Sequence, residues 1–208
     1  MKLYKNTLII SIFVLIICVL LSVYFEFYTE ERTQLISFSI NYSVGIACSV
    51  VVVIITTYLQ FKFEQRKILS SVLSELRFIF FHSWMVAMSL NSDEETPKTL
   101  WKYHYDEIYD VIKKTSSGIS QIEWIWFQKK KETNKLNKAI IKLLMDMVKG
   151  PDKSEKDCLI CLIENPALIE AKEIAFSLSK NHEHYTEAIE SDFNSLQKEL
   201  KQWKSIKD

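Results

Sequence analysis

The distribution of apolar and charged residues divides the chain into two unlike parts. Two long runs near the N-terminus, residues 7–25 and 33–61, contain no charged residue. Each is long enough to cross a hydrocarbon core about 30 Å thick. After residue 61 charged and apolar residues alternate, as in an ordinary water-soluble domain. The pattern predicts a transmembrane hairpin over residues 1–61, with spans at about 7–25 and 36–59, and a cytoplasmic helical domain over 62–208.

In the second part, apolar residues recur at spacings of three and four, which is typical of amphipathic helices. The second span is expected to continue beyond the membrane as one helix, because residues 62–90 contain no Gly or Pro. Further helices are expected at about 98–114 and 120–149, separated by a break over 115–118. The second of these should stop at Gly150 and Pro151.

Two capping patterns mark the helices that follow. Ser154 with Asp157 three residues later predicts the N-cap and N3 positions of a short helix ending near Glu164. Asn165 followed by Pro166 predicts the start of the last helix. Its apolar stripe spans about 36 residues, to Trp203. This helix is expected to be either the long helix of a bundle or an oligomerising coiled coil.

Composition fixes the fold class. The chain contains only three Gly and three Pro residues, which argues for long helices and against a β-rich fold. We therefore predict an all-α protein: a two-helix transmembrane hairpin followed by a cytoplasmic helical bundle with a long C-terminal helix. No Gly-rich phosphate loop is present, and no cofactor is expected. The 26 basic and 26 acidic residues balance, so nucleic acid is not an expected partner.

The positive charges near the spans predict the orientation of the hairpin. The basic residues that flank its two ends are Lys2, Lys5, Lys62, Arg66 and Lys67, whereas the connecting loop contains only Arg32. Both termini should therefore be cytoplasmic in a multi-pass protein of the cell inner (cytoplasmic) membrane. The first apolar run is long for a signal peptide and lacks a small-x-small cleavage pattern, so it is expected to be retained.

The second span carries a polar and small-residue stripe. Ser37, Asn41, Gly45 and Ser49 lie at successive i+4 positions and share one helix face. Small residues allow close helix approach, and an Asn in hydrocarbon needs a hydrogen-bond partner. Two interpretations stay open: the stripe packs the two spans of one hairpin together, or it mediates self-association, around a polar pore in one version.

Arg77 and His82, in the segment LRFIFFH, match an Arg-x4-His pattern. The pattern resembles the catalytic motif of the HEPN superfamily, all-helical domains that often cleave RNA. In that family two such motifs pair across a dimer, and the Arg and His act on the scissile phosphate. The family usually has a polar residue after the Arg, whereas Phe78 follows here. We expect a packing role, with Arg77 snorkelling, and no enzyme activity.

Two further clusters have chemical interpretations. Cys158 and Cys161, with His182 and His184, have the residue types of a zinc site. Two residues apart on a helix, the His pair faces different directions, and apolar neighbours favour buried cysteines, so no metal is expected.

The segment WIWFQKKK is the other cluster. Its candidate residues are Trp124, Trp126, Lys129, Lys130 and Lys131. Aromatic residues beside a Lys cluster suit a membrane surface or single-stranded nucleic acid. A helix with an apolar inner face and a solvated end is the third interpretation.

The layout of the whole chain is similar to two-span membrane effector and accessory proteins of bacterial antiphage systems, both abortive-infection and CRISPR-associated. The segment TYLQFKFEQRKILSSVLSEL, residues 57–76, looks like their span-to-helix junction. The resemblance implies a defence protein that perturbs membrane integrity. It also implies partners: membrane lipid and further copies of the chain. A scaffold that recruits a cytoplasmic protein and a membrane-tethered HEPN-like RNase are the alternatives.

Overall fold

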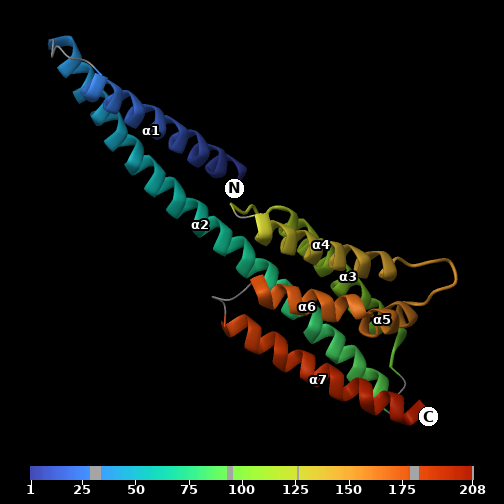
Figure 1. Cartoon of the computed structure of the whole chain (residues 1–208). Coiled ribbons are helices and arrows are strands. Elements are labelled where there is room, and N and C mark those ends of the chain that lie inside the picture. The colour runs from blue at the N-terminus through green and yellow to red at the C-terminus, as the bar shows by residue number, and fades with distance from the viewer. Residues whose placement is uncertain (29–33, 93–95, 126, 179–182, 208) are drawn as a thin grey trace. The chain divides into compact units, whose positions relative to one another are not determined.

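The computed structural model describes residues 1–28, 34–92, 96–125, 127–178 and 183–207. Within them the chain forms seven helices and no strand, which confirms the all-α class (Figure 1). The helices are α1 (Lys2–Tyr28), α2 (Gln34–Asn91), α3 (Lys98–Ser120), α4 (Phe127–Met147), α5 (Glu155–Ile163), α6 (Pro166–Leu178) and α7 (Glu183–Lys207). They fall into two compact units, which we call the hairpin unit (Met1–Arg66) and the bundle unit (Lys67–Asp208). Helix α2 contributes residues to both.

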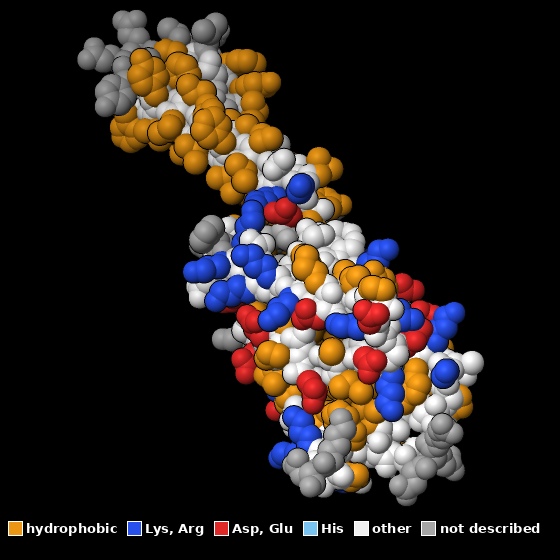
Figure 2. Space-filling model, turned by 90° about the vertical axis from the view of Figure 1, so that its right-hand side faces the viewer, with side chains coloured by type: hydrophobic (Ala, Val, Ile, Leu, Met, Phe, Trp, Pro, Cys, Tyr) orange, Lys and Arg blue, Asp and Glu red, His pale blue; other side chains and the backbone are white. Residues whose placement is uncertain are grey.

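The hairpin unit exposes its apolar side chains. By length and composition, two of the described helices could cross a membrane, over Lys2–Phe27 and Ile36–Asn91. Only 11% of the most apolar stretch of the first helix is buried, and none of that in the second. Figure 2 shows hydrophobic side chains coating this unit, whereas Lys, Arg, Asp and Glu side chains cover much of the bundle unit. A core helix of a water-soluble protein would instead bury such residues.

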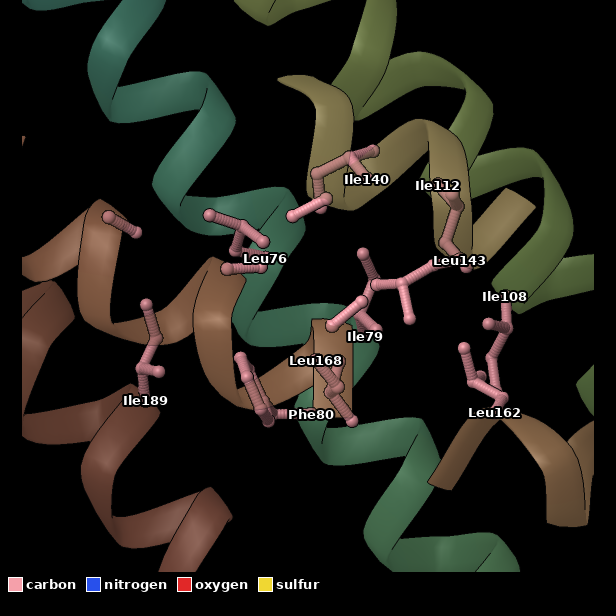
Figure 3. Packing of buried hydrophobic residues seen from close by; sticks show 14 of the residues in the cluster. Leu76, Ile79, Phe80, Ile108, Ile112, Ile140, Leu143, Leu162, Leu168 and Ile189 are labelled. Atoms are coloured by element: carbon pink, nitrogen blue, oxygen red, sulfur yellow. The ribbon is translucent and has the colours of Figure 1, made fainter. Parts of the chain in front are cut away.

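The bundle unit is built around the C-terminal part of α2. Lys114 of α3 pairs with Glu75 of α2 at 3.0 Å, and the Asn91 amide donates to Glu199 of α7 at 2.8 Å. Helix α2 thus lies between α3 and α7. Burial of each large apolar side chain contributes about 1.5–3 kcal/mol. Those that converge on the core in Figure 3 include Leu76, Ile79, Phe80, Ile112, Ile140, Leu143, Leu168 and Ile189.

Both predicted N-caps are confirmed. The Ser154 hydroxyl accepts from the Asp157 amide at 3.1 Å, and the Asp157 carboxylate accepts from the Ser154 amide at 3.2 Å. This capping box starts α5. The Asn165 side chain accepts from the Ala167 amide at 3.0 Å, and α6 begins at Pro166. Local chemistry therefore sets both helix starts.

The predicted break over residues 115–118 was wrong, because α3 continues through it to Ser120. The hydroxyls there find partners that permit a helix. The Thr115 hydroxyl donates to the Val111 carbonyl at 2.7 Å, and the Ser116 hydroxyl donates to the Asn137 side chain of α4 at 3.0 Å. Ile119 is buried in the core, and this burial stabilises the extra turn of α3. The next helix, expected from about residue 120, begins at Phe127 instead.

The last helix also differs from the prediction. Residues 166–203 do not form one helix, because α6 ends at Leu178 and α7 begins at Glu183. The Lys129 ammonium donates to the Ser177 carbonyl at 3.0 Å, so a side chain of α4 satisfies the end of α6. The apolar stripe faces the bundle core, where Ala171, Ala175 and Ile189 are almost completely buried. It serves as bundle packing and not as a free coiled-coil seam.

Candidate functional site

The stripe of the second span lies on the exposed face of α2 in the hairpin unit. Ser37, Asn41, Gly45 and Ser49 are all exposed, so they do not pack against α1. Three of them line a hollow of about 390 Å³, together with Tyr42, Ile46, Val50 and Val53. A Cβ atom built on Gly45 would have nothing within 4 Å, so this point of the helix surface is open to another helix.

The polar groups of the stripe differ in their hydrogen bonding. The Ser49 hydroxyl donates to the Gly45 carbonyl at 3.0 Å, which satisfies it within the helix. The Asn41 amide makes no hydrogen bond to any residue that the structure describes. On α1, Ser22 donates to the Cys18 carbonyl at 2.9 Å within its own helix. Asn41 therefore presents an amide outward, among apolar side chains, with its bonding capacity unused.

Arg77 and His82 are not brought together within the chain. They are five positions apart on α2, which places them about 140° apart around the helix. The Arg77 guanidinium pairs with the Asp192 carboxylate of α7 at 3.4 Å, and its side chain is 47% exposed. His82 is buried, and its Nδ1 lies 3.3 Å from Nδ1 of His104 on α3. Each side chain therefore has a packing partner of its own on a different helix.

The His82–His104 contact has consequences for protonation. Two Nδ1 atoms in contact need one proton between them, so one imidazole donates and the other accepts. Burial lowers the pKa of His82, against the opposing effect of the Glu107 carboxylate. Burial also lowers the pKa of His104, and the charge of His82 lowers it further. The arrangement favours a neutral pair near neutral pH.

The zinc candidates differ in burial, as far as they are described. Cys158 is buried in the bundle core, whereas Cys161 and His184 are exposed. His182 lies outside the described residues. Burial raises the pKa of the Cys158 thiol, which disfavours the thiolate that a metal needs. Among the described residues, no three His, Cys, Asp or Glu side chains form a group that could hold a metal ion.

The segment WIWFQKKK has two of its candidates in structural roles. The Trp124 indole donates to the Thr133 hydroxyl at 2.6 Å, and Lys129 binds the end of α6. Lys130 and Lys131 are exposed, and Trp126 lies outside the described residues. Lys131 shares its side of α4 with further exposed lysines, Lys135, Lys138 and Lys142.

Sequence reasoning missed a second hollow, of about 500 Å³, in the bundle unit. The Lys156 ammonium lies over the Trp101 ring there, 5.5 Å from its centroid. Its lining comes from three separate segments, so no local motif could have revealed it: Ser89, Leu90, Ser92, Thr96, Lys98, Trp101, Ser154, Glu155 and Lys156.

Comparison of the chain with models of protein families, with curated proteins and with solved structures finds no match in any of the three. A functional inference therefore rests on the residues of the chain itself.

Proposed function

We propose that the protein is a membrane-anchored helical protein that self-associates through α2 and perturbs membrane integrity, as a bacterial defence effector would. One observation carries the proposal: the exposed hollow around Gly45, with the unused amide of Asn41 at its edge. A lipid-facing helix with no partner would gain nothing from an Asn at this position.

Support for the anchor comes from exposure. Large apolar side chains on α1 remain open, among them Leu3 at 75%, Phe13 at 65% and Leu20 at 62% exposed. In water such a surface would drive aggregation, whereas hydrocarbon solvates it. Helical backbone also satisfies its own hydrogen bonds in lipid. Basic residues precede the first span and follow the second. Together with the exposed apolar surface, they favour a protein of the cytoplasmic membrane with both termini in the cytoplasm.

Support for self-association comes from what α2 leaves unsatisfied. Gly45 permits two helix backbones to approach closely, and Asn41 of one copy can bond Asn41 of another. Such interhelical bonds contribute only about 0.6–2 kcal/mol each. The stripe of α6 and α7 is buried inside the bundle unit, so it adds no coiled-coil seam. Association therefore depends on α2. Several copies arranged about an axis would bring Ser37, Asn41 and Ser49 together as a polar path.

The test compares Asn41→Leu and Gly45→Leu with the matched control Val44→Leu. Val44 is 47% exposed and does not line the hollow. The full chain is reconstituted into dye-loaded vesicles, and cross-linking and leakage are measured. We expect both stripe variants to weaken association about 3- to 30-fold and to abolish leakage, with insertion intact. The control should match the wild type.

A strictly monomeric wild type, or stripe variants with unchanged assembly and leakage, would remove the proposal in favour of a membrane-tethered scaffold. The defence role has its own readout. Cells expressing Asn41→Leu should lose any protection against phage that the wild-type protein gives.

A further inference from the structure

One face of α4 is strongly basic. Lys131, Lys135, Lys138 and Lys142 are spaced by four, three and four residues, which places them within an arc of about 60° around the helix. All four are exposed. We call this set the lysine face. Residues on the other side of α4, including Leu136, Ile140 and Leu143, are buried in the core and hold the helix in this orientation.

The chain does not neutralise the lysine face. None of its four lysines has a carboxylate oxygen within 4.0 Å among the described residues. The two acidic residues of α4 are directed to other partners. Glu132 accepts from Lys129 at 3.4 Å, and Asp146 accepts from the Asn165 amide at 2.6 Å. On the face of the bundle unit that Figure 2 shows, basic and acidic side chains both occur. Four uncompensated charges along about 16 Å of helix suit a surface of many phosphates.

We propose that the lysine face binds the anionic phospholipid headgroups of the membrane that holds the hairpin unit. This inference rests on the membrane-anchoring part of the proposed function. The chain passes directly from Arg66 of the hairpin unit to Lys67 of the bundle unit, so the bundle unit is held at high effective concentration beside the bilayer. Lysine ammonium groups act as point charges and need no fixed geometry, which fits a fluid array of headgroups.

The same face fits single-stranded nucleic acid less well. Binding of that kind combines positive charge with aromatic side chains on which bases stack. The one aromatic residue of α4 is Phe127, at its first position, and no aromatic residue stands between Lys131 and Lys142. The Trp124 indole just before the helix is bound to Thr133. The lysines share their face with Asn134 and Met145. A run of four lysines with no aromatic residue between them favours the headgroup surface.

The test measures the acylation rate of each lysine in the full chain, reconstituted in phosphatidylcholine vesicles with or without phosphatidylglycerol. A water-soluble N-hydroxysuccinimide ester is the probe, and mass spectrometry reads each site. We expect the lysine face to react about fivefold more slowly when phosphatidylglycerol is present at low salt, and to recover at high salt. Lys198 and Lys201 of α7, which are exposed and unpaired, should not change.

A paired substitution sharpens the test. In Lys135→Gln/Lys138→Gln, the remaining Lys131 and Lys142 should lose their protection, with helix content unchanged by circular dichroism. The matched variant Lys198→Gln/Lys201→Gln should keep it. Equal rates in both lipids, or equal slowing at Lys198 and Lys201, would overturn the proposal. Protection by polyuridine but not by phosphatidylglycerol would overturn it in favour of nucleic acid.

Dye leakage from the same vesicles separates this inference from the proposed function. Protection of the lysines without leakage would support headgroup binding by the lysine face and overturn the proposed membrane perturbation. Leakage without protection would support membrane perturbation and overturn headgroup binding. If an alkaline wash strips the chain from the vesicles, the anchor fails and the lysine proposal fails with it.

Discussion

At the scale of single residues, the His82–His104 pair shows how a side chain gains a role that its sequence context does not display. The spacing of His82 from Arg77 matches the Arg-x4-His pattern, yet the hydrogen-bond partner of His82 is His104 of α3, 22 residues away. Arg77 instead pairs with Asp192, 115 residues away. Aromatic rings surround the imidazole of His82: Phe78 lies 4.2 Å and Phe81 5.7 Å from it, centroid to centroid. A buried contact of His82 and a partly exposed ion pair of Arg77 give each residue a packing role.

The pair predicts an acid-sensitive bundle. Because burial lowers both pKa values from 6.5, the unfolded chain binds protons that the folded chain does not bind as pH falls below 6.5. The free energy of unfolding should therefore keep its full value above pH 6.5 and decrease as the pH falls below it. Denaturant unfolding of the full chain in mild detergent, followed by circular dichroism between about pH 5 and 8, measures this.

The variant His82→Gln/His104→Gln provides the control for the acid effect. Two amides can still donate and accept a hydrogen bond, but they do not titrate. We expect the decrease in stability below pH 6.5 to become shallower in this variant. A wild type and a double variant with the same pH profile would show that the two imidazoles do not govern acid stability.

At the scale of elements, the crossing of α2 and α3 depends on Gly118. A Cβ atom at this position would lie 3.0 Å from Cγ2 of Val72, which is 1% exposed. The sequence suggested that Gly118 breaks a helix, whereas its absent side chain permits a close contact inside one. Val72 is β-branched and buried, so it has little freedom to move aside.

Gly118→Ala should therefore destabilise the bundle unit by about 1 kcal/mol, because overpacking outweighs the gain in helix propensity. In a Val72→Ala background, which removes the opposing methyl group, the same substitution should become neutral or stabilising. A double-mutant cycle on unfolding free energies measures the coupling between the two positions. Additive effects of the two substitutions would contradict the steric explanation.

At the scale of the whole molecule, the proposed membrane anchor has an expected orientation. Basic residues at both outer ends of the hairpin, set against Arg32 in the loop, predict cytoplasmic termini. A green fluorescent protein fused after Asp208 should be fluorescent, and alkaline phosphatase at the same place should be inactive. As the control, phosphatase fused after Tyr28 should be active. An active phosphatase after Asp208 would invert the topology.

The sequence by itself determined the features that depend on local chemistry. The all-α class follows from the scarcity of Gly and Pro and from 3/4 spacing. The starts of α5 and α6 follow from Ser154 and Asn165, whose side chains bond within three residues. The two apolar helices follow from uninterrupted hydrophobic runs. Each of these features depends on a few neighbouring residues, so it can be predicted from the sequence without knowledge of the fold.

Only the tertiary structure decided which faces are covered and which are left open. The stripe of α2 is exposed and does not face α1, and α6 and α7 are separate helices. Lys129 donates a hydrogen bond to the end of α6, whereas Lys130 and Lys131 are exposed. The tertiary structure also paired His82 with His104. These outcomes depend on contacts between segments far apart in the chain. The spacing of residues along one helix determines which side chains share a face, but not which element covers that face.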